Sequence, residues 1–376
     1  MRLIDDMPVD WREGTFLGRL LLVEGPTPVL VRRGEVIDIS KSAPTTAHAI
    51  AGGGPCRLDG AGLGDLEDLD LHEASTTPRL LSPLDLQCVK ASGVTFAVSA
   101  VERVIEERAR GDAGAAQTIR KGLAERVGAD LSAVRPGSTE AEALKVVLIE
   151  EGLWSQYLEV AIGKDAEIFT KAPVLASVGW GDLVGVRADS AWNNPEPEVV
   201  LVCDPAGRVA GAALGNDVNL RDIEGRSALL LGKAKDNNAS AAVGPWIRLL
   251  DPTFGIDDVR DAVISLKVVG ADGFEMSGQS SMRLISRDPL ELVAQTLSPA
   301  HQYPDGFALY LGTMFAPIDD RDAPGQGFTH KVGDEVCVSS PKLGVLRNRV
   351  TTCEAAPPWT FGITGLMSNL AKRGLL

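Results

Sequence analysis

The chain has 376 residues, of which 44% are hydrophobic, enough to bury the core of one main domain and a smaller one. Its formal net charge of −14 disfavours nucleic acid as a partner, because phosphate binding requires a basic face. The five cysteines are scattered without a Cys-x-x-Cys pair, which favours reduced thiols over disulfides or a thiolate metal site.

The first 85 residues are predicted to form a small N-terminal β domain. Residues 1–14 are acidic and lack the basic-then-apolar order of a signal peptide, and the apolar runs of the chain are too short to cross a bilayer. We therefore expect a cytoplasmic protein without a membrane partner. Residues 15–40 alternate short apolar runs with Gly and Pro turns, a pattern typical of a β-meander. The main domain is expected over residues 86–376.

Residues 98–152 are predicted to be a helical insertion near the start of the main domain. Residues 102–111 and 116–128 have apolar positions at three- and four-residue spacing with charges between them. A further helix is expected to begin at Ser138, since acidic residues occupy its first turn. Beyond the insertion, short strands and turns dominate. The predicted class is therefore β-rich α+β, with a rolled or sandwiched sheet.

Three carboxylates on two neighbouring predicted strands form a candidate metal site. Glu196 and Glu198 are two residues apart, so on a strand their side chains point the same way. A tight turn that pairs Cys203 with Arg208 would place Asp217 diagonally from Glu196 on that same face, within side-chain reach. A register slip of one residue would move Asp217 to the other face.

Grouped carboxylates require a counter-ion, because two unit charges at about 4 Å repel by roughly 4 kcal/mol at an effective dielectric near 20. Oxygen ligands of this kind suit Mg²⁺, Mn²⁺ or Ca²⁺. An exposed acidic edge explains the spacing equally well. The basic residues that follow, including Arg221 and Lys235, favour the metal site, since they could hold a carboxylate and a polarised ketone beside the metal.

The motifs around these carboxylates resemble the signature of the fumarylacetoacetate hydrolase superfamily. The matching runs are, in chain order, Glu196-Pro197-Glu198, residues 216–222 (NDVNLRD), residues 233–236 (KAKD), Gly244-Pro245-Trp246, Leu311-Gly312-Thr313, Gly333-Asp334, Leu343-Gly344 and Asn348. The resemblance covers residues 86–350, which makes residues 86–376 the expected catalytic domain. It implies a mixed β-sandwich roll, a metal ion, Mg²⁺ or Mn²⁺, on Glu196, Glu198 and Asp217, and a homodimer or homotetramer.

Patterns along the whole chain, such as TFLGRL, WSQYLEV and WNNPEPE, are similar to one bacterial branch of this superfamily. That branch dehydrates 2-keto-3-deoxy-D-pentonates, derived from D-xylonate or D-arabinonate, to 2,5-dioxopentanoate in non-phosphorylating pentose degradation. Members that cleave acylpyruvates usually carry NYxxHxxE, and here Ser99 stands at the histidine and Glu102 at the glutamate. The missing imidazole favours dehydration through a metal-stabilised enolate over hydrolysis.

The resemblance implies that Lys235 and Glu102 are the catalytic acid and base, in either assignment. The expected substrate contacts are Ser99, Arg221, Thr313 and Lys171. Two alternatives stay open at this point. One is a C–C bond hydrolase of acylpyruvates or a 2-keto acid decarboxylase on the same fold, and the other is a non-catalytic keto-acid-binding protein.

Overall fold

Short strands make up most of the regular structure in a computed structural model, which describes residues 1–376 apart from 74–75, 121–130, 132–133, 316 and 325. The strands are β1 Thr15–Leu22, β2 Gly25–Arg32, β3 Glu35–Asp38, β4 Ala61–Asp65, β5 Arg79–Leu81, β6 Cys88–Gly93, β7 Glu167–Ala172, β8 Leu183–Val186, β9 Asn193–Asn194, β10 Pro197–Cys203, β11 Val209–Asp217, β12 Asn219–Leu220, β13 Ala241–Leu249, β14 Val263–Val269, β15 Glu275–Ser281, β16 Phe307–Tyr310, β17 Glu335–Ser340 and β18 Gly344–Thr352. The helices are α1 Thr46–Ala51, α2 Ala97–Arg108, α4 Thr139–Glu150, α5 Gln156–Ile162, α6 Arg221–Glu224, α7 Leu231–Lys235, α8 Ile256–Arg260, α9 Pro289–Thr296 and α10 Ile363–Lys372.

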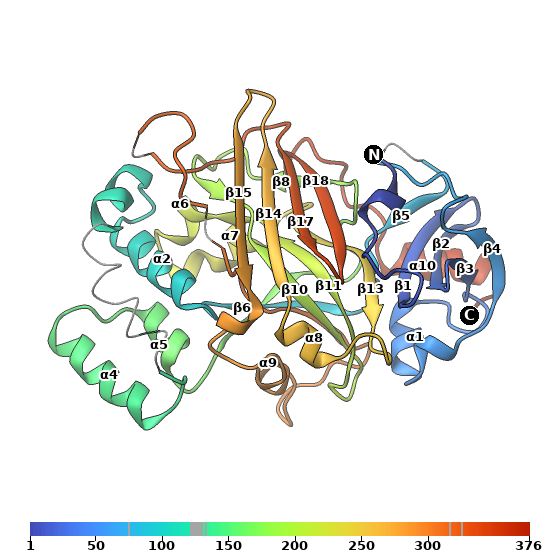
Figure 1. Cartoon of the computed structure of the whole chain (residues 1–376), viewed down its shortest axis with the longest axis horizontal. Helices are drawn as coiled ribbons and strands as arrows, with labels where there is room; N and C mark the ends of the chain where they lie inside the picture. Colours follow the sequence, from blue (N-terminus) through green and yellow to red (C-terminus); the bar gives the residue numbers. More distant parts are fainter. Residues whose placement is uncertain (74–75, 121–130, 132–133, 316, 325) are drawn as a thin grey trace.

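Two sheets packed face to face form the body of the molecule (Figure 1). The large sheet has the order β4-β3-β2-β1-β13-β11-β10-β16-β6-β7, with β5 also pairing with β1, and the second sheet has the order β15-β14-β17-β18-β8. β12 and β9 form a separate two-stranded pair. The prediction of a β-rich α+β fold with a rolled, sandwiched sheet is confirmed.

The central strand β10 explains why the sequence there is almost entirely apolar. Val199 and Leu201 pack into the core between the two sheets, whereas Val200 and Val202 pack into a second core on the other face of the large sheet. A strand covered on both faces loses the alternation of polar and apolar residues that a half-exposed strand shows. Packing on both faces also holds β10 in place. The candidate metal ligands lie at the N-terminal end of this strand.

The hairpin between β10 and β11 has a register different from the predicted one. Cys203 pairs with Val209, where we expected Arg208, and a bulge next to Cys203 adds a second one-residue shift. The predicted register was therefore wrong by two residues. Two shifts restore the parity of the strand, so Glu196 and Asp217 still lie on one face. They are also nearer than predicted, because the amide of Asp217 donates a hydrogen bond of 3.0 Å to the carbonyl of Glu196.

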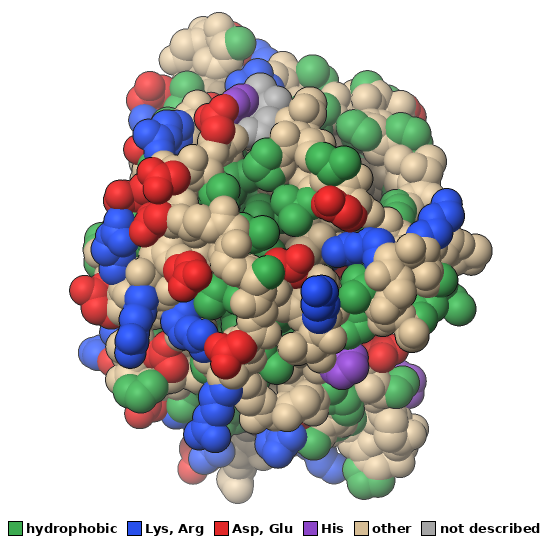
Figure 2. Space-filling view, turned by 90° about the vertical axis from the view of Figure 1, so that its right-hand side faces the viewer, with side chains coloured by type: hydrophobic (Ala, Val, Ile, Leu, Met, Phe, Trp, Pro, Cys, Tyr) green, Lys and Arg blue, Asp and Glu red, His purple; other side chains and the backbone are tan. Residues whose placement is uncertain are grey.

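The N-terminal strands extend the large sheet. β1, β2 and β3 form the predicted meander, and β1 also pairs with β13 of the main domain, with Phe16 opposite Arg248. The sheet is thus continuous across the expected boundary after residue 85, and that boundary stays a prediction. Helix α10 packs back on this end, where the Arg373 guanidinium donates to the carbonyl of Pro26. Figure 2 shows this end of the molecule with acidic and basic side chains interspersed.

The helical insertion follows β6. Helix α2 covers most of the predicted residues 102–111, and α4 begins after Ser138, whose hydroxyl accepts a hydrogen bond from the amide of Ala141. The predicted helix over residues 116–128 lies in part outside the described residues. Within the described part of the chain, none of the helices has both the length and the apolar character needed to cross a bilayer. The cytoplasmic location stays a prediction.

Candidate active site

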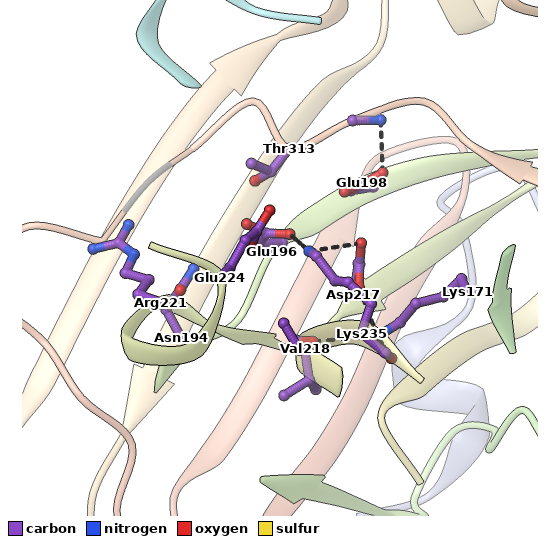
Figure 3. Close-up of polar contacts among 12 residues, drawn as sticks. Lys171, Asn194, Glu196, Glu198, Asp217, Val218, Arg221, Glu224, Lys235 and Thr313 are labelled. Carbon is purple, nitrogen blue, oxygen red and sulfur yellow. Dashed lines mark hydrogen bonds and ion pairs between the residues drawn. The ribbon is translucent and has the colours of Figure 1, made fainter. Parts of the chain in front are cut away.

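Three carboxylates meet where β10 begins and β11 ends (Figure 3). Glu196, Glu198 and Asp217 each offer one oxygen, and these oxygens lie within 4.8 Å of one another. Their exposed fractions are 4%, 1% and 2%, so the charges cannot be screened by bulk water. A buried cluster of this composition matches the oxygen ligands that Mg²⁺ and Mn²⁺ prefer.

The Glu198 carboxylate receives a hydrogen bond of 2.7 Å from the amide of Gly312. Gly312 has a φ of +96°, and a Cβ there would lie 2.0 Å from Oγ1 of Thr95, so this position requires glycine. Burial raises the pKa of Glu198 well above its usual range, and the neighbouring Asp217 and Glu196 raise it further. Among the described residues no lysine or arginine forms an ion pair with Glu198. A bound metal ion could therefore neutralise the charge of this carboxylate.

Two cations hold Glu196 from opposite sides. Nη2 of Arg103 lies 2.6 Å from Oε1, and the ammonium of Lys235 bonds to Oε2. Lys235 also lies 3.0 Å from Oδ2 of Asp217 and 5.9 Å from the ring centre of Phe169. Burial lowers the pKa of Lys235, but the Asp217 and Glu196 carboxylates outweigh that effect and raise it overall. The ammonium therefore stays charged at neutral pH.

A narrow cavity opens onto this cluster. Its lining residues are Ser92, Gly93, Val94, Ser99, Arg103, Glu167, Phe169, Glu196, Glu198, Asp217, Glu224, Lys235 and Thr313. The space in it that water centres can occupy is about 20 Å³, close to what a single water molecule requires. Charged side chains make up about half of this lining, so the cavity is strongly polar.

Glu167 lines the cavity and was missed from the sequence. It begins β7 and pairs with Gly93 of β6. A Cβ at Gly93 would lie 1.9 Å from Oε2 of Glu167, so the glycine lets this carboxylate lie across the strand. Burial raises the pKa of Glu167 to about 7, and the nearby Glu224 contributes to the rise. Strand parity places Glu167 and Phe169 on one face of β7, but the register shifts at Lys171, so parity alone could not relate Glu167 to that predicted site residue.

Arg103 and Glu224 were also missed. Nη1 of Arg103 lies 2.5 Å from Glu106 and 2.9 Å from Glu224, in addition to its bond with Glu196. Arg221 does not line the cavity, but its Nε lies 3.1 Å from Glu106. A chain of ion pairs thus runs from Arg221 through Glu106 and Arg103 to Glu196. Through this chain Arg221 can influence a candidate metal ligand without touching it.

Ser99 and Thr313 line the cavity as expected, but both hydroxyl groups donate to the main chain. The Ser99 hydroxyl donates to the carbonyl of Phe96 at 2.8 Å, and the Thr313 hydroxyl to that of Phe315 at 2.9 Å. Both oxygens also accept from the main chain, Ser99 from the amide of Phe96 at 3.3 Å and Thr313 from that of Phe315 at 3.5 Å. Their predicted contacts with substrate stay predictions.

Glu102 and Lys171 are not among the residues that line the cavity. Both Glu102 oxygens accept from the guanidinium of Arg120, at 2.8 and 2.6 Å. Adjacent residues of a helix differ in direction by about 100°, so when Arg103 points to the cavity Glu102 points elsewhere. The Lys171 side chain is fully buried behind Asp217.

A family profile and two named relatives match parts of this chain. A family profile described as "Fumarylacetoacetate (FAA) hydrolase C-terminal" matches residues 204–351. A "Probable 2-keto-3-deoxyxylonate dehydratase" of Haloferax volcanii is 30% identical over 206 residues, which are 54% of this chain and 66% of that protein. A "2-dehydro-3-deoxy-D-arabinonate dehydratase" of Saccharolobus solfataricus is 34% identical over 155 residues, 41% of this chain and 51% of that protein. The chain thus spans about two thirds and about half of the lengths of these relatives.

Solved structures share the fold over nearly the whole molecule. The apo form of a 2-keto-3-deoxy-D-arabinonate dehydratase superimposes with a TM-score of 0.63 at 21% identity, over 90% of this chain and 99% of that chain. A structure of 2-keto-3-deoxy-D-arabinonate dehydratase with magnesium and 2,5-dioxopentanoate has a TM-score of 0.62 at 20% identity and the same coverage. At these identities the likeness establishes the mixed β-sandwich roll.

Proposed function

Because the chain carries a fumarylacetoacetate hydrolase family domain, we propose that it is a metal-dependent hydro-lyase. Its substrate would be a 2-keto-3-deoxy-D-pentonate and its product 2,5-dioxopentanoate, in non-phosphorylating pentose degradation. Two curated relatives named as dehydratases of such acids support this assignment. The observation that carries it is the convergence of three buried carboxylates with Lys235 and Glu167 in one cavity, where none of the described lining residues is a histidine.

Glu196, Glu198 and Asp217 would hold the metal, with Mg²⁺ favoured because a relative of the same fold is described with magnesium bound. The residues fit such an ion, since their oxygens converge and Glu198 has only the amide of Gly312 as a hydrogen-bond donor in the described structure. When bound, the ion would polarise the 2-ketone of the substrate and acidify the protons on C3.

Lys235 would bind substrate oxygen. Its ammonium already lies among the carboxylates and stays protonated, so it can donate hydrogen bonds to the 1-carboxylate or the 2-ketone once these groups enter. The oxygen of a polarised ketone gains negative charge during the reaction. An ammonium beside it stabilises that charge where bulk water is excluded.

Glu167 is the best-placed group for proton transfer. It lines the cavity, and its pKa of about 7 lets it both accept and return a proton near neutral pH. The predicted alternative, Glu102, is engaged by Arg120 outside the cavity. We therefore assign to Glu167 the removal of a C3 proton and the return of that proton to the departing 4-hydroxyl.

The reaction also needs a proton shift after water has left. Loss of a C3 proton and the 4-hydroxyl gives a C3–C4 double bond and one water molecule. Moving a proton from C5 to C3, and then tautomerising the resulting C5 enol, gives the aldehyde of 2,5-dioxopentanoate. A carboxyl group that titrates near pH 7 can serve in both stages.

The test is to incubate the purified protein and Mg²⁺ with 2-keto-3-deoxy-D-xylonate and to assay 2,5-dioxopentanoate. A chelator should abolish the product, and Glu198→Gln should not form it. Release of pyruvate and an acid from an acylpyruvate, without any semialdehyde, would identify a C–C hydrolase. Release of carbon dioxide would identify a decarboxylase, and binding without turnover a keto-acid-binding protein. The predicted homodimer or homotetramer is tested by light scattering.

A further inference from the structure

A second lysine lies behind the carboxylate cluster, outside the cavity. Lys171 of β7 has an exposed fraction of 0%. Its Nζ lies 2.7 Å from Oδ1 of Asp217 and donates to the carbonyl of Lys235 at 2.5 Å and to the carbonyl of Val218 at 3.2 Å. Figure 3 shows Lys171 and Lys235 approaching Asp217 from different directions. We had predicted that Lys171 contacts the substrate. The structure does not support this prediction, because all of these bonds join Lys171 to other groups of the protein.

The roll of the large sheet brings Lys171 to this place. In sheet order, β10, β16 and β6 separate β11 from β7, so only curvature of the sheet lets β7 reach the end of β11. Glu167 and Phe169 of the same strand line the cavity, and the register of β7 shifts at Lys171, between Thr170 and Ala172. Burial lowers the pKa of Lys171, and the Asp217 carboxylate opposes that change. An ammonium without solvent contact is retained in a fold only when it is fully paired.

The two oxygens of Asp217 are divided between two lysines. Oδ1 faces Lys171 behind the cluster, and Oδ2 faces Lys235 on the cavity side. The same Lys171 ammonium holds the main-chain carbonyl of Lys235, the last residue of α7. One buried charge therefore orients a candidate metal ligand and anchors the backbone from which the cavity lysine projects.

We propose that Lys171 is a positioning residue, which sets the orientation of Asp217 for the metal and the placement of Lys235 for the substrate. This rests on the proposed function, in that Asp217 is taken as a ligand. Groups that orient metal ligands typically contribute about 10- to 100-fold to metal affinity or activity. Lys171 should contribute to both quantities, because it contacts both residues.

Ser240 separates the two effects. Its hydroxyl donates to the carbonyl of Lys235 at 2.9 Å and accepts from the amide of Asn237 at 3.1 Å, and Nζ of Lys171 lies 3.4 Å away. Among the described contacts it does not bond to Asp217. Ser240→Ala should therefore disturb the Lys235 carbonyl more than Asp217, because toward Asp217 it removes only the long hydrogen bond of 3.4 Å that Lys171 donates to the hydroxyl.

The experiment compares full-length Lys171→Met, Lys171→Gln and Ser240→Ala with the wild type. Mg²⁺ affinity is measured by calorimetry without substrate, and kcat and KM are measured separately. Lys90→Met is the matched control, because Lys90 lies on the adjacent strand β6, is half-buried and bonds to Thr170 away from the cluster. We expect Lys171→Met to weaken Mg²⁺ binding about 10- to 100-fold and to lower kcat. Ser240→Ala should lower kcat with Mg²⁺ affinity nearly unchanged, and Lys90→Met should change neither.

A folded Lys171→Met protein that binds Mg²⁺ as the wild type does would overturn the proposal. Lys171→Gln keeps a donor for the Lys235 carbonyl but removes the ion pair that orients Asp217, so it should lose Mg²⁺ affinity more than kcat. If Lys171→Met does not fold, this variant decides: wild-type Mg²⁺ affinity in Lys171→Gln would also overturn the proposal. A wild-type protein that binds no divalent metal contradicts the proposed function itself, and that outcome is visible before any variant is compared.

Discussion

The ammonium of Lys235 lies 3.0 Å from Oδ2 of Asp217 and also bonds to Oε2 of Glu196. It therefore stands between two of the three carboxylates that would hold the metal ion. Its side chain is also one of those that line the narrow cavity. Lysine and metal compete for the same oxygens in this arrangement.

Lys235→Met should therefore bind Mg²⁺ more tightly than the wild type when substrate is absent, although it should be inactive. A hydrogen bond between charged groups is worth about 1.5–3 kcal/mol, and 1.4 kcal/mol is a tenfold change in affinity. We expect Mg²⁺ affinity to rise about tenfold or more, measured by calorimetry. Lys90→Met serves as the control for loss of a lysine. Equal or weaker binding by Lys235→Met would show that the ammonium does not compete with the metal.

Glu198→Gln should abolish metal binding and activity without weakening the metal-free fold. The pKa of Glu198 is raised by burial and by its carboxylate neighbours, so an ionised Glu198 destabilises the folded protein and a neutral amide does not. The amide oxygen can still accept from the amide of Gly312. Thermal unfolding should give an equal or higher Tm without metal and no increase in Tm on adding Mg²⁺. Glu275→Gln, on an exposed strand position, is the charge-matched control. A Glu198→Gln protein with a much lower Tm contradicts this account.

Glu167 should make the stability of the metal-free protein depend on pH. Its pKa is raised from 4.5 to about 7, so between these values the folded protein holds a proton that the unfolded chain has lost. The contribution of Glu167 to the free energy of unfolding is fully present below pH 4.5 and is lost as the pH rises through 7. A shift of this size corresponds to about 3 kcal/mol, at 1.36 kcal/mol for each pH unit.

Urea unfolding of the wild type and of Glu167→Gln at several pH values checks this dependence. The difference between the two free energies of unfolding should change across that pH window, with the wild type losing stability relative to the variant as the pH rises. Parallel pH curves for the two proteins would mean that Glu167 titrates at its ordinary pKa.

Gly93→Ala should move the Glu167 carboxylate out of its place. The added Cβ would lie 1.9 Å from Oε2, so the side chain of Glu167 must turn away from β6. We expect a loss of stability of about 1–3 kcal/mol, as for other overpacked sites, and a large decrease in kcat. Mg²⁺ affinity should change little, because Glu167 is not a proposed ligand. At Gly362, where a Cβ meets nothing within 4 Å, the same substitution is the control. Full activity of Gly93→Ala would exclude Glu167 from proton transfer.

The three carboxylates could be predicted from sequence because they depend on one hairpin, in which side chains alternate between the two faces of its strands. Glu196 and Glu198 share a face on any straight strand. Asp217 reached that face although the predicted register was wrong, since the turn and the bulge each shifted it by one residue. Lys235 and Thr313 were found from motifs that keep their spacing along the chain. All of these relations are local or follow from one strand pairing.

The surroundings of the cluster depend on how distant elements cover one another. Periodicity assigns a face to each residue within an element, but it does not say which element will lie against that face. The roll of the sheet carries β7 across to β11, which makes Glu167 a cavity residue and buries Lys171 behind Asp217. The packing of α2 selects Arg103 over the adjacent Glu102. The sequence by itself determined the fold class and the three carboxylates, through strand parity and motif spacing. Only the tertiary structure decided which acids and cations surround them, because those contacts join segments far apart in the chain.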